Sequence, residues 1–463
     1  MWRPGTRACP HATRGRPAGP CSDDPVCDHR VVQHPAETLD LDILDVAHGG
    51  VFVARHEGRV VFVPDALPGE RMRVRLTDTS KSSFWRAEAI EVLDASPHRR
   101  SHVWAPADIG EDPERRPGGA DFGHIDLGHQ RELKAKVLRD ALRRMAGVET
   151  DVAVEPAGAD ESSDGTGWRT RVSLHVDADG RIGPFAARSH RVVEVDDHPL
   201  ATAAIAQTAG HPRSAAPGRL DLVQPSDGRV RVLARPETQR GRGRRGPARP
   251  VDPALREIVH QTVAGREFRV DVGGFWQVHR LAASALSESI GQGLRAAGQH
   301  ALDPEAWHLD LYGGVGLLAA ALADLGGAST RVTSVEADER ATDHASENLA
   351  EWVGARAETG RVDRWLHALE QSASAAERAR LQAGVVVLDP PRAGAGREVV
   401  AALTRLQPRS LVYVACDPVA LARDVAQLRE AGYELASLRG LDLFPHSHHV
   451  EAVAVLTREG ASS

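Results

Sequence analysis

The fold of this chain is decided by one short stretch, Leu411-Val412-Tyr413-Val414-Ala415-Cys416-Asp417-Pro418. Its apolar run is typical of a strand buried on both faces, and the Asp-Pro step ends that strand. Cys416 is therefore expected at the carboxyl edge of a sheet, where open α/β folds bind ligands. A lone cysteine at a strand end is often only a small buried hydrophobe. Whether Cys416 is a functional residue must therefore be judged from the residues expected near it. A helix predicted to start near Val419 would lower the pKa of the thiol.

Three further apolar runs precede this stretch, and each ends in polar or glycine-rich residues. They are His308–Tyr312, Arg331–Glu336 and Gly384–Asp389. Alanine-rich helical stretches separate them, which is the pattern of a parallel sheet with crossover helices. Residues 266–463 are therefore predicted to form a Rossmann-like α/β domain in which four strand ends meet at one edge.

A glycine-rich turn, Gly313-Gly314-Val315-Gly316, follows the first of these strands. Glycines let the backbone approach a ligand closely. The next strand ends in Glu336, and an acid in that place can bind both hydroxyls of a ribose. The turn is not a Gly-x-Gly-x-x-Gly dinucleotide fingerprint and nothing in it calls for a pyrophosphate. We therefore expect S-adenosylmethionine as the cofactor rather than NAD.

The third strand ends in Asp389-Pro390-Pro391-Arg392. The two prolines stiffen the exit of the strand and remove two backbone donors, which would hold the Asp389 carboxylate rigidly at the sheet edge. Arg392 could pair with a phosphate or with a pyrimidine carbonyl.

Three histidines and a glutamate occur together in Phe444–Glu451, a composition that suggests a metal site. No cysteine lies nearby in the sequence, and Glu451 opens a strand-like run. We therefore interpret Glu451 as a general base beside Cys416, with zinc as the lesser alternative.

The first part of the chain has a different pattern. Between residues 38 and 97, short runs alternate apolar and polar residues and are separated by glycine-containing turns, which predicts a small OB-like β-barrel. The connection Lys81–Arg86 is interpreted as a basic loop that carries Phe84 and Trp85. Such a loop can contact phosphates and stack on bases, and we favour that function slightly over a solvated loop with one anchoring aromatic.

Residues 98–265 combine irregular segments, strands and helices, so we predict a mixed α+β central domain that binds RNA. A helix expected over residues 130–146 has one apolar face, and lysines and arginines cover the rest. Those basic side chains fit a solvated helix face and an RNA contact equally well. The tract Arg240–Gly246 can bind RNA backbone without sequence preference or form a disordered hairpin tip.

Composition limits the classes of function. The 463 residues carry 57 basic and 64 acidic side chains, a net charge of −7 before histidines, so RNA would have to be bound by local patches. Four cysteines in so long a chain make no disulfide framework, which favours a reducing, cytoplasmic setting. No apolar run approaches the length of a membrane span. We expect a cytoplasmic monomer whose residues 1–37 form a disordered tail or an over-extended translation start.

Several of these stretches carry a resemblance. Ala47–Gly50, Gly58–Val63 and Ala66–Arg71 resemble a TRAM domain, a small oligonucleotide-binding β-barrel of tRNA- and rRNA-modifying enzymes. Over Leu39–Leu456 the chain resembles the RNA 5-methyluridine (uracil-carbon-5) methyltransferase family. The most specific matches are Phe275–Val278, Asp310–Gly316, Asp389–Arg392, Val412–Arg423 and Phe444–Glu451.

The resemblance implies an S-adenosylmethionine-dependent enzyme that forms 5-methyluridine in RNA. Cys416 matches the family nucleophile and Glu451 the family base. Helix 130–146 is implied to pack with the catalytic domain, and Arg392 is our candidate for a contact with the substrate. The implied cofactor contacts are Gln277, Tyr312, Glu336, Asp363 and Asp389.

The sequence departs from the family pattern in one respect. Many relatives with a TRAM domain hold an iron–sulfur cluster through four cysteines. The matching stretch here, Trp104–His129, contains no cysteine, and His198-Pro199-Leu200 stands where the fourth ligand is expected. We therefore expect no cluster. The TRAM-like barrel, which tRNA-specific relatives often lack, favours rRNA over tRNA as the substrate.

Other functions remain as alternatives. A methyltransferase acting on an amino nitrogen of an RNA base would typically carry an aromatic residue where Arg392 stands, and it would need no cysteine. An RNA-binding protein that holds the cofactor without catalysis is disfavoured, because a cysteine and a glutamate stand where chemistry would need them. A nicotinamide oxidoreductase ranks third.

Overall fold

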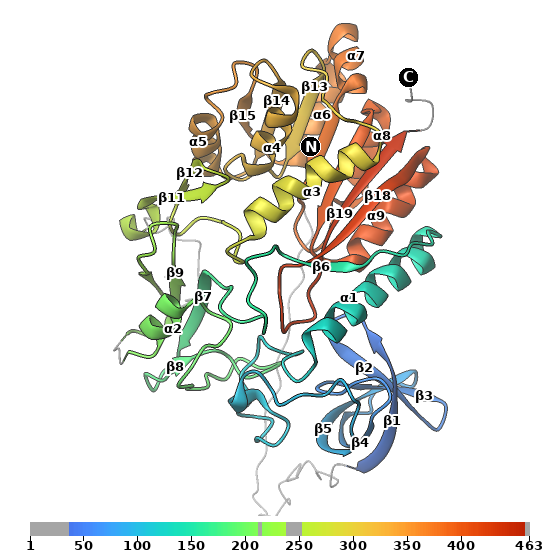
Figure 1. Ribbon diagram of the computed structural model, residues 1–463, viewed down its shortest axis with the longest axis vertical. Coiled ribbons are helices and arrows are strands. Elements are labelled where there is room, and N and C mark those ends of the chain that lie inside the picture. The colour runs from blue at the N-terminus through green and yellow to red at the C-terminus, as the bar shows by residue number, and fades with distance from the viewer. Residues whose placement is uncertain (1–36, 212–214, 238–251, 459–463) are drawn as a thin grey trace, which may run out of the picture. The chain divides into compact units, whose positions relative to one another are not determined.

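The computed structural model describes residues 37–211, 215–237 and 252–458. Residues 1–36 of the predicted tail and the tract Arg240–Gly246 lie outside these ranges. No helix in the described ranges is long and apolar enough to cross a membrane. The labelled elements of Figure 1 all belong to the compact unit Thr38–Ser463.

A closed five-stranded barrel begins this unit, with strand order β1-β2-β3-β5-β4. The strands are β1 (Thr38–Ala47), β2 (Val51–His56), β3 (Arg59–Val63), β4 (Arg71–Asp78) and β5 (Phe84–Asp94). Successive side chains of a strand point to opposite faces, and Phe52, Met72 and Val74 are fully buried inside the barrel. The barrel predicted from the alternating pattern is confirmed.

Phe84 and Trp85 begin strand β5, so the prediction that they lie in a loop is wrong. Strand β5 runs parallel to β3, with Phe84 opposite Val60. The Phe84 ring packs edge-on against Phe62 with centroids 5.6 Å apart, and the Arg59 guanidinium lies 4.8 Å from the Trp85 ring centroid. The residues before Phe84 are polar, and its partners lie on a different strand. The start of β5 could therefore not be recognised from the local sequence.

The central domain is built on a four-stranded sheet of order β10-β9-β7-β8. Its strands are β7 (Arg171–Val176), β8 (Ile182–Gly183), β9 (Gly218–Val223) and β10 (Arg231–Pro236). Helix α2 (Ala203–Ala209) buries Ile205 against Leu174 and Leu222 of this sheet. A hairpin of β11 (Ile258–Val263) and β12 (Arg266–Asp271) leads to the last domain. The predicted mixed α+β character is confirmed.

The last domain holds an eight-stranded sheet of order β15-β14-β13-β16-β17-β19-β18-β6. Its strands are β13 (Trp307–Leu311), β14 (Arg331–Glu336), β15 (Arg356–Thr359), β16 (Val385–Leu388), β17 (Ser410–Ala415), β18 (Tyr433–Asp442), β19 (Glu451–Arg458) and β6 (Val154–Pro156). Strands β13 to β17 are parallel, whereas β19 is antiparallel to both β17 and β18. The edge strand β6 comes from well before the α/β region.

Helices cover both faces of this sheet (Figure 1). They are α3 (Ala282–Ala296), α4 (Leu317–Gly326), α5 (Glu339–Asn348), α6 (Val362–Ser372), α7 (Ala375–Ala383), α8 (Gly396–Leu406) and α9 (Pro418–Glu430). Val387 and Val412 pack with α3 and α4 in one apolar cluster. Leu388 and Tyr413, the next residues along the same strands, pack with α8 and α9 in another. Both faces of the strands are therefore buried, which confirms the predicted Rossmann-like α/β class.

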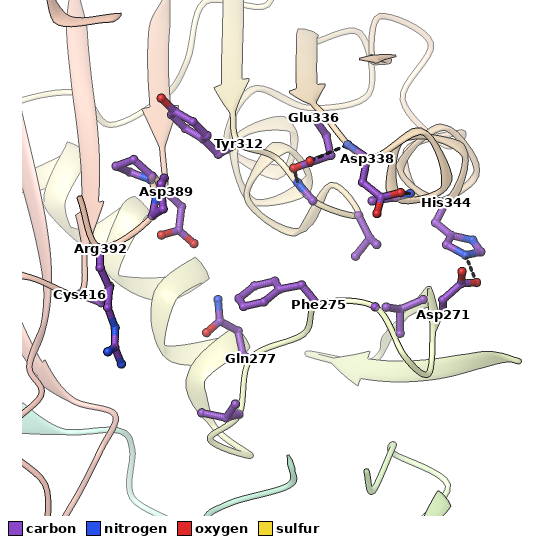
Figure 2. Close-up of a pocket in the computed structure, with 18 of the residues that line it drawn as sticks. Asp271, Phe275, Gln277, Tyr312, Glu336, Asp338, His344, Asp389, Arg392 and Cys416 are labelled. Atoms are coloured by element: carbon purple, nitrogen blue, oxygen red, sulfur yellow. Dashed lines mark hydrogen bonds and ion pairs between the residues drawn. The ribbon is translucent and has the colours of Figure 1, made fainter. Parts of the chain in front are cut away.

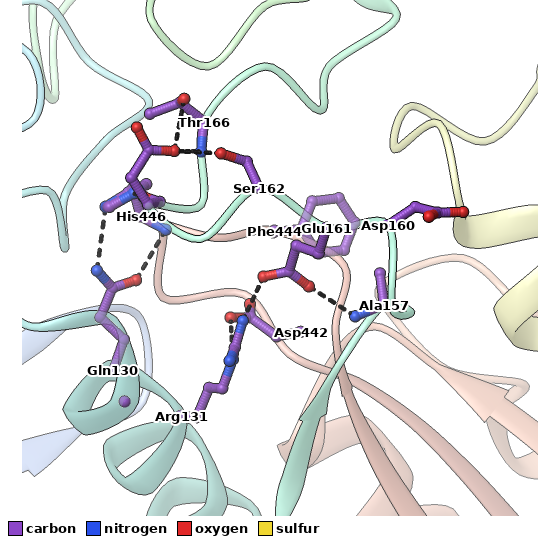
Figure 3. Close-up of polar contacts among 12 residues, drawn as sticks. Gln130, Arg131, Ala157, Asp160, Glu161, Ser162, Thr166, Asp442, Phe444 and His446 are labelled. Atoms are coloured by element: carbon purple, nitrogen blue, oxygen red, sulfur yellow. Dashed lines mark hydrogen bonds and ion pairs between the residues drawn. The ribbon is translucent and has the colours of Figure 1, made fainter.

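Helix α1 (Leu127–Ala141), which continues into a π-helical turn (Leu142–Ala146), is fixed by a buried charge cluster. Lys134 is completely buried, and its Nζ lies 2.6 Å from Asp442 Oδ1. Arg131 Nε lies 3.1 Å from the other oxygen of Asp442, and its guanidinium also pairs with Glu161 (Figure 3). The sequence suggested that the basic side chains of this helix are either solvated or in contact with RNA. Both interpretations are wrong for Lys134 and Arg131. Their partner Asp442 ends β18, so the ion pairs hold α1 against the eight-stranded sheet.

Candidate active site

A cavity of about 600 Å³ opens at the carboxyl edge of the sheet. It receives side chains from the ends of β13, β14, β16 and β17 and from the segment after β12. Figure 2 shows the side chains of Asp389 and Gln277 pointing toward the same space, with Tyr312, Glu336 and Cys416 around them. The strand-end residues that the sequence singled out are thus neighbours in space, apart from the exceptions given below.

The glycine turn after β13 shapes one wall of this cavity. Tyr312 adopts a left-handed backbone conformation with φ of 63°, which is unusual for a bulky residue and is typical of functional sites. A Cβ atom on Gly313 would collide with the Ser334 hydroxyl and the Asp310 carboxylate, so only glycine fits there. The turn can therefore lie close against the second strand.

Glu336 is held in place at the end of β14. Its Oε2 accepts a hydrogen bond of 3.1 Å from the Gly314 N–H, and its Oε1 accepts one of 2.8 Å from the Asp338 N–H. Two backbone donors therefore orient one carboxylate at the cavity wall. This arrangement suits the recognition of vicinal hydroxyl groups, as on a ribose.

Asp310, buried beneath the glycine turn, was not singled out as a site residue from the sequence. Its Oδ2 accepts hydrogen bonds from the Ser334 hydroxyl at 2.9 Å and from the Ala319 N–H at 3.2 Å. Its Oδ1 has no partner within the described ranges, and burial raises the pKa of this carboxyl to about 7. Asp310 joins the first strand, the second strand and helix α4 below the site.

Two carboxyl groups, Asp389 and Glu451, share the inner part of the cavity. Burial raises the pKa of Asp389 to about 7. Burial, and then the charge of Asp389, raise the pKa of Glu451 well above its ordinary value. Like charges in a desolvated site disfavour double ionisation, so the pair retains a proton more readily than two isolated carboxyls would. A glutamate in this state suits proton transfer near neutral pH.

Cys416 stands opposite Glu451 because of strand register. Ala415 of β17 faces Ala452 of β19 in the antiparallel pair, so Cys416 and Glu451 are the next residues beyond that pair. Facing residues in an antiparallel pair lie roughly 4.5–5.5 Å apart at their Cα atoms. The half-buried thiol and the buried carboxyl therefore meet at the same edge.

The expectation that a helix N-terminus lowers the pKa of this thiol is wrong. Burial, followed by the charges of Glu451 and Asp389, raises the pKa of Cys416 to about 11. Helix α9 does start beside it, but Asp417 caps that helix by accepting hydrogen bonds from the Val419 and Ala420 N–H groups. The Asp417 side chain therefore takes up two of the N–H donors at the start of this helix.

The barrel turn between β1 and β2 also comes close to Cys416. His48 Nε2 lies 2.9 Å from Asp417 Oδ2, and Gly50 packs so tightly against His448 that a Cβ atom would not fit. A second cavity of about 180 Å³ lies here. It is lined by this turn and by residues that also line the first cavity, namely Arg392, Cys416 and His449. Cys416 thus lines both cavities, which the sequence did not indicate because the partners are far apart along the chain.

The three histidines of the 444–451 loop have separate partners. His446 Nε2 lies 2.7 Å from the Asp164 carbonyl, and His448 Nδ1 lies 2.6 Å from Asp121 Oδ2. His449 Nε2 lies 3.3 Å from Arg392 NH2, and burial lowers the pKa of His449 to about 3, so this ring is neutral. Among the described residues no three His, Cys, Asp or Glu side chains form a group that could hold a metal ion.

Three predicted residues lie away from the first cavity. Asp363 pairs with Arg361 at 2.9 Å and lines an adjacent space of about 500 Å³, which also contains Tyr312 and Glu336. Phe84 and Trp85 lie on the barrel and line neither cavity beside Cys416. The structure brings other side chains to the cavity that sequence reasoning missed. They are Asp271, Asp338, Arg340 and His344.

A signal for part of this missed group was present in the sequence. Asp338 comes two residues after Glu336, at the start of the following helix, where a short acid is a usual cap. Asp271 accepts hydrogen bonds from Arg340 at 2.6 Å and from His344 at 2.8 Å, and those contacts depend on how the β11–β12 hairpin meets α5. They carry no local sequence signature.

Comparisons with known proteins agree with this architecture. Residues 34–90 match the family model "TRAM domain", and residues 367–459 match "tRNA (Uracil-5-)-methyltransferase". An "uncharacterized RNA methyltransferase" of Streptomyces avermitilis is 38% identical over 447 residues, which cover 91% of this chain and 98% of the relative. An "uncharacterized RNA methyltransferase" of Bifidobacterium longum is 35% identical over 428 residues, which cover 89% of this chain and 95% of the relative.

One solved structure shares the fold over nearly the whole chain. It is the Pyrococcus abyssi tRNA (uracil-54, C5)-methyltransferase in complex with S-adenosyl-L-homocysteine, with a TM-score of 0.61 and 21% sequence identity. The alignment covers 90% of this chain and 99% of that one. At this identity the likeness shows a shared fold and nothing more.

Proposed function

This chain belongs to the RNA (uracil-5-)methyltransferase family with a TRAM domain and is an S-adenosylmethionine-dependent enzyme, and we propose that it forms 5-methyluridine through a covalent bond between Cys416 and the uracil ring. The observation that carries the proposal is the meeting of a thiol and two carboxyls with raised pKa values in one cavity. Methyl transfer to an amino nitrogen would need no such thiol.

The first cavity fits the cofactor. The oriented Glu336 carboxylate suits the two ribose hydroxyls, and the glycine turn leaves room for a nucleoside against the backbone. Gln277, Tyr312 and Asp389 line the same space, and we assign them further contacts with the cofactor. Asp363, which lines the adjoining space together with Tyr312 and Glu336, is assigned a contact with the cofactor from there. When bound there, S-adenosylmethionine supplies an electrophilic methyl group.

The residues of this chain then activate the base. Carbon 5 of uracil is a poor nucleophile, so Cys416 Sγ, once its proton has passed to solvent, adds to carbon 6 and moves an electron pair toward carbon 5. After carbon 5 has gained the methyl group, Glu451 takes the proton from carbon 5. The bond between Sγ and carbon 6 then breaks and releases the thiolate. Arg392, at the mouth of both cavities, is assigned to a carbonyl or phosphate of the substrate.

The target base has to leave its stack to reach Cys416, because stacking shields carbons 5 and 6. The second cavity, walled by the barrel turn at His48, adjoins Cys416 and is the natural entry for an unpaired nucleotide. We assign Phe84 and Trp85, together with Arg59, to contacts with neighbouring RNA on the barrel surface.

We favour rRNA over tRNA as the substrate because of the TRAM barrel. The Pyrococcus abyssi enzyme acts on tRNA, so tRNA is the alternative. Deletion of the gene, followed by mapping of 5-methyluridine in rRNA and tRNA, decides between them. We expect one rRNA uridine to lose its methyl group and to regain it with the wild-type gene but not with Cys416→Ala. A change confined to tRNA would reverse the choice of RNA, and no change in either would remove 5-methyluridine as the product.

Purified variants separate this chemistry from its competitors. Cys416→Ala should abolish transfer of radiolabelled methyl groups to RNA and leave binding of S-adenosylmethionine near normal, because the cofactor contacts lie elsewhere in the cavity. Full activity in that variant would favour a methyltransferase acting on an amino nitrogen. Absence of turnover in the wild-type protein would favour an RNA-binding protein without catalysis.

A further inference from the structure

A third cavity, of about 340 Å³, lies in the central domain, away from Cys416. It is lined by part of β7 and by loops around residues 184–189 and 198–201. Two arginines, Arg169 and Arg188, face it, and none of the described residues that line it is acidic. Arg188 pairs with Asp65 Oδ2 at 3.5 Å, so the uncompensated positive charge at this space is that of Arg169.

Arg169 is the unusual member of this lining. Its side chain is largely buried, its Nε has no hydrogen-bond partner, and it forms no ion pair with any residue in the described part of the chain. Its guanidinium carbon lies 5.2 Å from the centroid of the Trp168 ring. By contrast Arg171, two residues further on, donates hydrogen bonds to the carbonyls of Val272 and Gly274. An unpaired buried charge is costly, so Arg169 is preorganised for an anion that comes from outside.

The same cavity offers a flat apolar surface. The rings of His175 and Phe185 stack with centroids 3.5 Å apart and an interplanar angle of 14°, and both line the space. Burial lowers the pKa values of His175 and His198, so these rings act as neutral aromatic surfaces. A cation beside an aromatic platform is the combination that binds a phosphate and its base in single-stranded nucleic acid.

The two residues that flank Arg169 in the sequence contact residues that line the first cavity. Thr170, which follows Arg169, donates its N–H to the Val278 carbonyl at 2.8 Å, and Val278 lines the first cavity beside Gln277. Trp168, which precedes Arg169, packs edge-on against Phe444 with centroids 6.2 Å apart, and Phe444 also lines the first cavity. The walls of the two cavities are therefore in direct contact with each other.

We propose that this cavity binds one nucleotide of the substrate RNA other than the target uridine, with a phosphate on Arg169 and the base beside the Phe185–His175 stack. The proposal rests on the proposed function only in taking RNA as the ligand. In this proposal the central domain binds a nucleotide of the same RNA whose target uridine is bound near Cys416.

The test compares Arg169→Gln with Arg181→Gln, a matched loss of one charge on an exposed, ion-paired arginine outside the cavity. Binding of total RNA from the deletion strain is measured without cofactor over a range of salt. We expect Arg169→Gln to weaken binding roughly 10–100-fold, the usual effect of losing a charge-assisted contact, and to lower the salt slope by about 0.7–0.9. Its melting temperature should change little or rise, because the substitution removes a buried charge and gives up only the contact with the Trp168 ring, with no ion pair among the described residues broken. Arg181→Gln should bind as the wild type does.

Two results would overturn the proposal. A lowered melting temperature with unchanged RNA affinity and salt slope would make Arg169 a structural residue. Stabilisation of the wild type, but not of Arg169→Gln, by inorganic phosphate, with equal RNA binding by both, would make the cavity a site for a free anion. The binding measurement involves no methyl transfer. It therefore tests this cavity even if the protein does not form 5-methyluridine.

Discussion

Cys416 and Glu451 stand one residue beyond the last registered pair of two antiparallel strands, Ala415 and Ala452. This position explains how residues 35 apart in sequence share one cavity without any flexible loop to bring them together. Cys416, the proposed nucleophile, follows the end of one strand, and Glu451, the proposed base, begins the neighbouring strand. Placement on rigid strands favours precise geometry at a reacting base.

Glu451→Gln should separate formation of the covalent adduct from its release. The amide cannot take the proton from carbon 5, so turnover to free 5-methyluridine should fall by roughly 10²–10⁴-fold, while Cys416 can still add to carbon 6. A covalent enzyme–RNA species should accumulate and migrate more slowly on a denaturing gel. Its absence, together with wild-type turnover, would remove Glu451 from the reaction. The double variant with Cys416→Ala is the control and should give no shifted band.

The reactivity of Cys416 should depend on pH in a defined direction. Burial and the charges of Glu451 and Asp389 raise the pKa of the thiol to about 11, so the thiolate fraction is small at neutral pH and grows as pH rises. Alkylation of Cys416 by iodoacetamide, followed by peptide mass spectrometry, should therefore speed up toward that value. Glu451→Gln removes a negative charge, so the pH at which the alkylation rate reaches half its maximum should be lower in that variant. A midpoint near 8.5 in both proteins would show that the carboxyls do not act on the thiol.

Asp442→Asn should destabilise the protein strongly. Asp442 is completely buried between Lys134 and Arg131, and removing one partner of a buried ion pair costs about 3–5 kcal/mol because the other charges are left uncompensated. The free energy of unfolding by urea measures the loss. Glu91→Gln, which breaks an exposed pair with Arg73, is the matched control and should cost about 1 kcal/mol or less. Equal losses in the two variants would contradict the structural role of the cluster.

Iron analysis tests the prediction that no iron–sulfur cluster is present. Protein purified without oxygen should contain no stoichiometric iron or sulfide and should show no visible absorbance band. In place of cysteine ligands, Trp104 is buried in an apolar cluster with Trp168 and Leu200, and its indole N–H donates to Asp197 Oδ1 at 2.8 Å. Iron and sulfide in stoichiometric amounts would refute the prediction.

Much of the α/β domain could be predicted because its strands are continuous apolar runs with polar ends. The Asp-Pro step at Asp417, the glycine turn and the acid at Glu336 are local signals, and each lies at the sheet edge. Parallel strands with crossover helices bring such ends together in any sequence of this pattern. For that reason the cavity could be anticipated without knowing the register of a single pair.

Contacts between distant segments could not be predicted. Lys134 and Asp442 are 308 residues apart, and His48 and Asp417 are 369 apart, and no periodicity or motif links either pair. The pKa of Cys416 was misjudged for a similar reason. Its sign depends on burial and on Glu451 and Asp389, which arrive from other strands, rather than on the helix that follows it in the chain.

The most direct test of covalent catalysis uses substrate RNA in which uracil is replaced by 5-fluorouracil. Fluorine at carbon 5 cannot be removed as a proton, so the bond between Sγ and carbon 6 should persist after methyl transfer. Tandem mass spectrometry of the digested complex should find a methylated 5-fluorouridine attached to the peptide that carries Cys416, and none with Cys416→Ala. Methylation of normal RNA without any such adduct, or an adduct on another residue, would contradict the assignment of Cys416 as the nucleophile.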